Sequence, residues 1–228
     1  MNYEVLCGQS AAVLKLTMDA GESITTEGGA MLSMSSGLRV ETTTRSKKNK
    51  GGVLKSIKRM LGGENFFLNH YSSSSPGSEL MLAPVLSGDL IAVEMDQSED
   101  LIVQAGSWLA STEGVGLDTQ FAGLGKALFS GEGMFWLKLS GNGSAFINSF
   151  GAIYCKEVDG DYIVDTGHIV AYTSGLDFKA TKAGGSWATA IFGGEGLVCR
   201  FSGRGRVWIQ SHNPGSFGGT LGPNLKPR

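Results

Sequence analysis

Three glutamates recur at the same place in a repeated pattern, each directly after a glycine: Glu64, Glu132 and Glu195. Three carboxylates brought to a common axis could bind a cation, because carboxylate oxygens are good cation ligands. A glutamate after a glycine turn can equally accept backbone N–H bonds where a strand begins. A position present in every copy serves folding more simply than it serves a single site, so we interpret these residues as structural.

The other residues with chemical potential are isolated. The chain has three histidines that are far apart in sequence: His70, His168 and His212. Without a His-x-His pair and a nearby acid, a metal-dependent cupin-type enzyme is disfavoured. The Gly123–Lys126 segment resembles a phosphate loop but has Gln120 where that loop needs glycine, and Ala127 where it needs serine or threonine. We therefore predict no catalytic, cofactor-binding or metal-binding residues.

Positive charge is concentrated in one segment of fifteen residues that contains seven basic side chains: Arg45, Lys47, Lys48, Lys50, Lys55, Lys58 and Arg59. Residues 60–125 hold no lysine or arginine, whereas nine acids lie between Glu64 and Asp118. The basic segment could be a solvated loop, a contact with the acids of a neighbouring subunit, or a site for RNA or lipid headgroups. A smaller basic set, of Arg200, Arg204 and Arg206, is a secondary candidate.

The overall composition narrows the class of protein. A net charge of −2 argues against a protein built chiefly to bind nucleic acid. The 35 glycines and the low share of charged residues, 18%, suit short strands joined by tight turns. The three cysteines predict reduced and largely buried thiols, and no stretch reaches the ~20 apolar residues of a membrane-spanning helix. We expect a soluble, cytoplasmic protein.

A motif of two glycines eight positions apart, around an apolar pair and small hydroxyl residues, occurs at residues 29–37, 106–114 and 167–175. Such a repeat indicates one supersecondary unit used three times. We predict repeat unit 1 at residues 1–80, unit 2 at residues 81–147 and unit 3 at residues 148–228, with a flexible tail at 213–228. The three units are expected to form one fused structural domain.

Each predicted unit is rich in strands that alternate apolar and polar residues, such as Ala12–Leu16 and Ile91–Met95. The glycine-bearing segments 140–143 and 202–205 predict hairpin turns, and Val53–Leu61 is the only helical candidate. Units that bury one face must pack on one another, most simply around a pseudo-threefold axis. The predicted fold is all-β, with three tandem β-sandwich or short double-stranded β-helix units.

Several longer motifs carry a family resemblance: residues 160–171, 192–198 and 205–211, together with the three Gly-Glu steps. With them the chain resembles bacterial and archaeal proteins of unknown function that are related to the mitochondrial "altered inheritance of mitochondria" family. The resemblance implies units folded like the subunit of the tryptophan RNA-binding attenuation protein. It also implies oligomers, with trimers plausible, and it supplies no catalytic residues.

These observations favour a non-enzymatic scaffold or interaction protein that forms a homo-oligomer, with a trimer preferred, that needs no cofactor and that could take a protein partner. One alternative is binding of RNA or an anionic surface, such as a membrane, through the basic segment of unit 1. A second alternative is a small-ligand binder or enzyme that uses a cleft between repeats.

Overall fold

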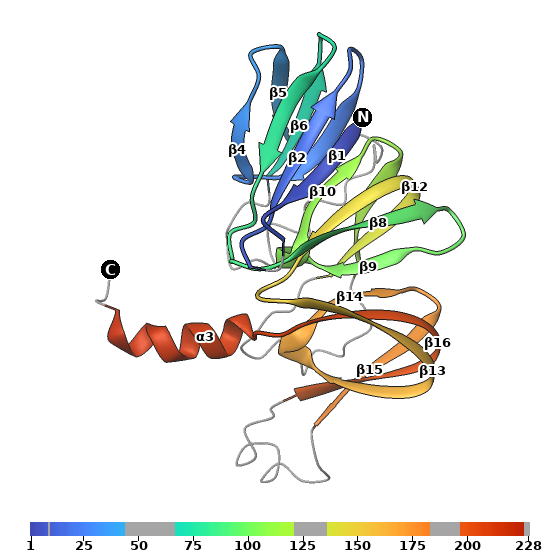
Figure 1. Ribbon diagram of the computed structural model, residues 1–228. Helices are drawn as coiled ribbons and strands as arrows, with labels where there is room; N and C mark the ends of the chain where they lie inside the picture. The colour runs from blue at the N-terminus through green and yellow to red at the C-terminus, as the bar shows by residue number, and fades with distance from the viewer. Residues whose placement is uncertain (9, 44–66, 121–135, 183–196, 226–228) are drawn as a thin grey trace.

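The computed structural model describes residues 1–8, 10–43, 67–120, 136–182 and 197–225, and this part of the chain is predominantly antiparallel β-structure (Figure 1). The all-β class is therefore confirmed. Its first strands are β1 (Asn2–Leu6), β2 (Val13–Met18), β3 (Ser23–Glu27), β4 (Met31–Met34), β5 (Leu38–Thr43), β6 (Leu68–Ser73) and β7 (Ser78–Leu82).

The middle and last groups of strands stack beneath the first group along the long axis of the molecule (Figure 1). The middle group is β8 (Leu90–Asp96), β9 (Leu101–Gln104), β10 (Trp108–Thr112), β11 (Val115–Gln120) and β12 (Trp136–Asn148). The last group is β13 (Ile153–Asp165), β14 (Ile169–Thr173), β15 (Leu176–Lys182) and β16 (Leu197–Gln210).

Strand positions follow the alternation of apolar and polar residues. In β2, Leu14, Leu16 and Met18 are fully buried, while the residues between them are partly exposed, as a half-buried strand requires. The predicted strands at Ala12–Leu16 and Ile91–Met95 are confirmed as β2 and β8.

The predicted hairpin turns at residues 140–143 and 202–205 are wrong. The chain does not fold back there, because β12 and β16 continue through these segments as single long strands. Gly141 and Gly143 have φ angles of +120° and +139°, which bend β12 without ending it. Its first half then pairs with β9 and β11 and its second half with β8 and β10. A glycine-bearing turn and a glycine-bearing bend look alike in sequence.

The bend in β12 also needs glycine for lack of space. A Cβ atom on Gly143 would lie 2.2 Å from Thr112 Oγ1, which accepts a hydrogen bond of 3.0 Å from the Ser144 N–H. The same arrangement occurs in β16, where a Cβ on Gly205 would lie 2.4 Å from Thr173 Oγ1. That hydroxyl accepts the Arg206 N–H at 3.0 Å.

The strands form a four-stranded sheet, β1-β2-β7-β4, and a twelve-stranded sheet that runs through all three groups. Two strand pairs connect the groups, β10 with β3 and β14 with β9. The buried cores cross the same boundaries, since Leu109 and Phe146 pack with Leu14 of β2, and Ile102 packs with Phe201 of β16. The hydrophobic interior is therefore continuous from one group to the next.

Three strands share a local irregularity. The pairing register shifts between Met31 and Ser33 in β4, between Trp108 and Ala110 in β10, and between Ile169 and Ala171 in β14. Short 3-10 turns, η1 (Ala105–Ser107) and η3 (Thr166–His168), precede β10 and β14. Bulges of this kind bend a strand and increase its twist.

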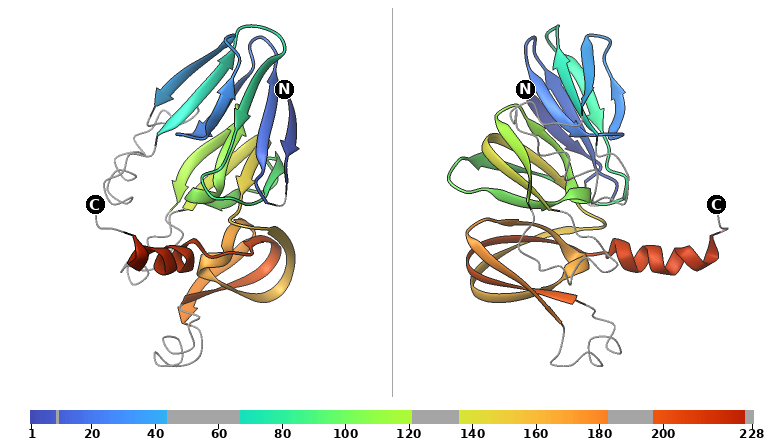
Figure 2. Two further views of the ribbon diagram at one scale, coloured as in Figure 1. Left: turned by 60° about the vertical axis from the view of Figure 1, so that its left-hand side comes forward. Right: turned by 180° about the vertical axis from the view of Figure 1, so that it is seen from behind.

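The C-terminal segment carries the last helix, and the flexibility expected for residues 213–228 stays a prediction. The segment forms the helix α3 (Pro214–Leu221), followed by the 3-10 turn η4 (Gly222–Asn224). Asn213 begins the helix, because its side chain accepts hydrogen bonds from the N–H groups of Gly215 and Ser216. Figures 1 and 2 show α3 projecting away from the sheets. Within the described ranges, no helix has the length and apolar character to cross a membrane.

Candidate functional site

The basic segment lies outside the described residues. This holds for all seven of its side chains: Arg45, Lys47, Lys48, Lys50, Lys55, Lys58 and Arg59. Glu64, Glu132, Glu195 and the helical candidate Val53–Leu61 also lie outside them. Whether these residues form a loop, an interface or a binding site stays a prediction.

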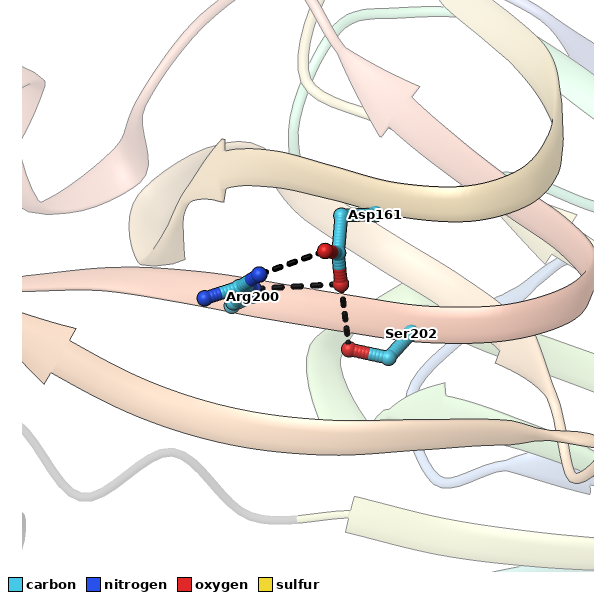
Figure 3. Close-up of polar contacts among 3 residues, drawn as sticks. All are labelled: Asp161, Arg200 and Ser202. Carbon is cyan, nitrogen blue, oxygen red and sulfur yellow. Dashed lines mark hydrogen bonds and ion pairs between the residues drawn. The ribbon is translucent and has the colours of Figure 1, made fainter.

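The secondary basic set lies on β16, where two of its three arginines are paired with acids of β13. Arg200 donates to both carboxylate oxygens of Asp161, at 3.1 and 2.5 Å, and Ser202 Oγ donates to the same carboxylate at 2.7 Å (Figure 3). These hydrogen bonds lower the pKa of Asp161 to about 2. Arg200 is therefore held as a surface ion pair.

The other two arginines continue along the same strand. Arg204 donates to Asp159 at 3.0 Å, and the Arg206 guanidinium lies 5.1 Å from the centre of the Trp208 ring. Since two of the three positive charges are neutralised by neighbouring acids, this face offers little net charge to an RNA backbone.

The histidines have structural surroundings. His70 is buried between two threonines, with Thr25 Oγ1 2.9 Å from its Nδ1 and Thr43 Oγ1 2.8 Å from its Nε2. His168 ends the turn η3, and its Nδ1 donates to the Gln210 carbonyl at 2.8 Å. Among the described residues no cluster of histidine, cysteine and acidic side chains could hold a metal ion.

Two cysteines contradict the expectation of largely buried thiols. Cys199 is buried in the core, but Cys7 and Cys155 are exposed. Cys155 lies on β13, which has a neighbouring strand, β16, on only one side in the described part of the chain. Burial of part of this side chain still raises the pKa of the Cys155 thiol.

One carboxylate lies in an unusual environment. Glu27 ends β3, opposite Leu68 of β6, and burial raises its pKa to about 7. Within the described ranges its carboxylate makes no hydrogen bond or ion pair, so nothing compensates the cost of removing the charge from water.

The pairs that join the groups of strands are buried and regular. In the β14–β9 pair, Tyr172 lies opposite Ile102 and Ala171 lies opposite Val103. In the β10–β3 pair, Ser111 lies opposite Thr25 and Ala110 lies opposite Thr26. At these two junctions β10 and β14 therefore each have strands on both sides.

Among the strands that have a neighbour on only one side in the described part of the chain, two match the junction strands in sequence. The strand β4 pairs only with β7, and residues 161–165 of β13 pair only with β16. Both carry exposed apolar side chains: Met31, Leu32 and Met34 on β4 are 43%, 56% and 41% exposed, and Ile163 on β13 is 61% exposed. We call these segments the β4 edge and the β13 edge.

The β4 edge is exposed where matching positions are buried. In the double-glycine motif, Leu32 occupies the position of Leu109 and Val170, and both of those side chains are fully buried. β4 is only four residues long, but an apolar strand edge without a neighbour can still pair with a further strand. Sequence reasoning missed both edges, although the apolar residues at the three matching motif positions were a usable signal.

Comparison with known proteins gives a consistent picture. A sequence profile of the family described as "Mitochondrial biogenesis AIM24" matches residues 3–212. An uncharacterised protein of Streptococcus pyogenes serotype M6 is 30% identical over 225 residues, covering 97% of this chain and 90% of the relative. A crystal structure of a Streptococcus pyogenes protein superposes with a TM-score of 0.76 at 26% identity, covering 98% of this chain and 99% of the other.

Proposed function

The chain belongs to the Mitochondrial biogenesis AIM24 family, and from this premise we propose that it is a non-enzymatic scaffold whose copies join head to tail through the β4 and β13 edges. The single observation that carries the proposal is the exposure of apolar side chains on two strand edges, in the first and last groups of strands, that have no further neighbour among the described residues. Burying one such side chain contributes about 1.5–3 kcal/mol, so several together can hold copies in contact.

The proposal treats the three groups of strands as tandem units, in line with the attenuation-protein-like fold that the sequence resemblance implies. It is supported by the repeated motif and by the register shift after the first residue of β4, β10 and β14. It is also supported by the connections between groups. In both of them a strand of the later group pairs in antiparallel orientation with a strand of the preceding group, β10 with β3 and β14 with β9.

The repeated motif fixes the register that the intermolecular pair would take. Counting from the double-glycine motif, Met34 occupies the position of Tyr172, which lies opposite Ile102. Counting from the residue before η3, Ile163 occupies the position of Ile102. The β4 edge of one copy would thus meet the β13 edge of another with Met34 opposite Ile163.

Two further pairs follow from the same count. Ser33 of one copy would lie opposite Val164 of the next, and Ser35 would lie opposite Tyr162. The contact uses different surfaces on the two copies, so repeated use either closes a ring or grows a fibre. We favour a closed trimer, which is the assembly that the family resemblance implies.

Charge substitution at each edge tests the assembly. Ile163→Asp and Met34→Asp should each convert the protein into a monomer in sedimentation velocity, because a carboxylate cannot be buried at the junction. Ile163→Val keeps an apolar β-branched side chain and should preserve the mass of the assembly. A monomeric native protein at high concentration would overturn the proposal.

Mixing the two monomeric variants tests the head-to-tail geometry. The Ile163→Asp variant keeps an intact β4 edge, and the Met34→Asp variant keeps an intact β13 edge. Their mixture should form a dimer with one copy of each and nothing larger. If the two variants stay monomeric together at high concentration, the copies do not join through these two edges.

A further inference from the structure

The helix α3 makes few contacts with the other described residues of its own chain. Its first turn is anchored, since Phe217 lies 5.1 Å from Phe150, ring centre to ring centre. The two orientations in Figure 2 show the remainder of the helix extending past the sheets. No α3 residue is buried.

The sequence of α3 is poorly suited to an isolated helix. Three of its eight residues are glycine, and each costs about 1 kcal/mol relative to alanine in a helix interior. Isolated helices shorter than ~12 residues are marginal in water even with favourable sequences. A helix with this composition therefore needs a surface on which to pack.

The exposed side of α3 is apolar. Phe217 and Leu221 are four residues apart and so lie on one face of the helix, and Leu225 follows after the turn η4. Their side chains are 45%, 41% and 66% exposed, and no charged residue occurs from Asn213 to Leu225. The partner surface is expected to be apolar as well.

The segment that follows β16 indicates where a second copy of the chain would lie. The connections between strand groups are hydrogen-bonded to one another in order. The Gly151 N–H donates to Ser87 at 3.0 Å, and the His212 N–H donates to Phe150 at 3.1 Å. Another copy joined at the β13 edge would place its own β7–β8 connection next in this series, beside the start of α3.

That connection carries an exposed apolar side chain at the matching position. Val85, Phe150 and His212 occupy matching positions in the three groups of strands. The first residues of β4, β10 and β14 pair with Leu82, Ile147 and Ile209, and the three matching residues each lie three positions after that partner. Phe150 and His212 are in ring contact at 5.0 Å. Val85 is 88% exposed, so no described residue of its own chain covers this side chain.

We propose that α3 docks on the next copy of this chain, with the face formed by Phe217 and Leu221 against Val85 of that copy. The inference rests on the head-to-tail assembly proposed above, which supplies the neighbouring copy. It adds a second contact, made by the C-terminal helix, to the strand pairing.

Hydrogen exchange of the α3 amides, followed by mass spectrometry, tests the docking. In the assembled native protein residues 214–225 should exchange at least tenfold more slowly than in the monomeric Ile163→Asp variant. Equal exchange in the assembled protein and that monomer would overturn the docking. Protection that appears only with phosphatidylcholine–phosphatidylglycerol vesicles would overturn it in favour of a membrane.

Two substitutions locate the contact. Leu221→Asp and Val85→Asp should each weaken association about tenfold, with the strand junction still formed, whereas Leu221→Met should leave it unchanged. An unaltered dissociation constant for Val85→Asp would overturn the site. These outcomes differ from failure of the assembly itself, in which the native protein would already be monomeric.

Discussion

Tyr172 lies directly opposite Ile102 across the β14–β9 pair, and neither side chain exposes more than 4% of its surface. The two residues belong to different groups of strands, so this contact holds the middle and last groups together. Met34 and Ile163 occupy the matching positions at the two ends of the molecule, where both side chains are exposed. The same pair of positions is thus buried inside the chain and open at its ends.

Shortening a side chain to alanine should affect the free energy of unfolding differently at the buried junction and at the exposed edge. Tyr172→Ala should lower the free energy of unfolding by about 3–5 kcal/mol, because it leaves a cavity in the core. Ile163→Ala should change the stability of the monomer by no more than about 0.5 kcal/mol. Urea unfolding at concentrations where the protein is monomeric measures both. A similar loss in the two variants would contradict the distinction.

Glu27 should make stability depend on pH. Its pKa in the folded protein is about 7, above its ordinary value of 4.5, so the folded state holds the proton more tightly than the unfolded state does. The contribution of this group to stability is therefore complete below pH 4.5 and is lost as the pH rises towards 7.

Glu27→Gln removes this titration. The variant should be more stable than the native protein at pH 8 by about 1–3 kcal/mol, with the advantage vanishing near pH 4. Thermal unfolding at a series of pH values gives the comparison, and Glu4→Gln on the exposed strand β1 is the control. Parallel pH profiles for native protein and Glu27→Gln would count against a raised pKa for this partly buried carboxylate.

Gly143 should tolerate no larger residue. Gly143→Ala places a Cβ 2.2 Å from Thr112 Oγ1 at a φ of +139°, so both space and backbone conformation oppose it. We expect a loss of at least about 2 kcal/mol in the free energy of unfolding. Gly106→Ala is the matched control, because nothing lies within 4 Å of the added Cβ and φ is not positive there. Equal losses would argue that the bend in β12 does not depend on glycine.

Two neighbouring hydroxyls on β10 should respond in opposite ways. Ser111 is 1% exposed and its Oγ has no hydrogen-bond partner among the described residues, so Ser111→Ala should be neutral or stabilise the protein by up to about 1 kcal/mol. Thr112 Oγ1 accepts the Ser144 N–H, so Thr112→Val should cost about 1–2 kcal/mol. The shift in the melting temperature gives the sign for each variant, and destabilisation by Ser111→Ala would show that its hydroxyl is satisfied.

Much of the fold could be predicted from local patterns. The alternation of apolar and polar residues identified β2 and β8, because a strand with one covered face imposes that period on its sequence. The bends in β12 and β16 could not be distinguished from turns, since the same glycines serve both and only the pairing partners differ. The helix α3 was missed because its proline and glycines favour a loop by composition.

The candidate edges were harder to predict than the strands. Leu32 and Leu109 look equivalent in sequence, yet one is exposed and the other buried, because burial depends on which group of strands follows in space. The pairing of Arg200 with Asp161 was missed for a similar reason. It depends on the register between β13 and β16, which the amino-acid types alone do not fix.

The long strand β12 has a consequence for how the molecule comes apart under heat or force. Its unbroken backbone pairs with β8, β9, β10 and β11, so the middle group must open as one cooperative piece. In the first group the corresponding stretch is divided into β6 and β7, which belong to different sheets. That end can open one sheet at a time and is where unfolding should begin.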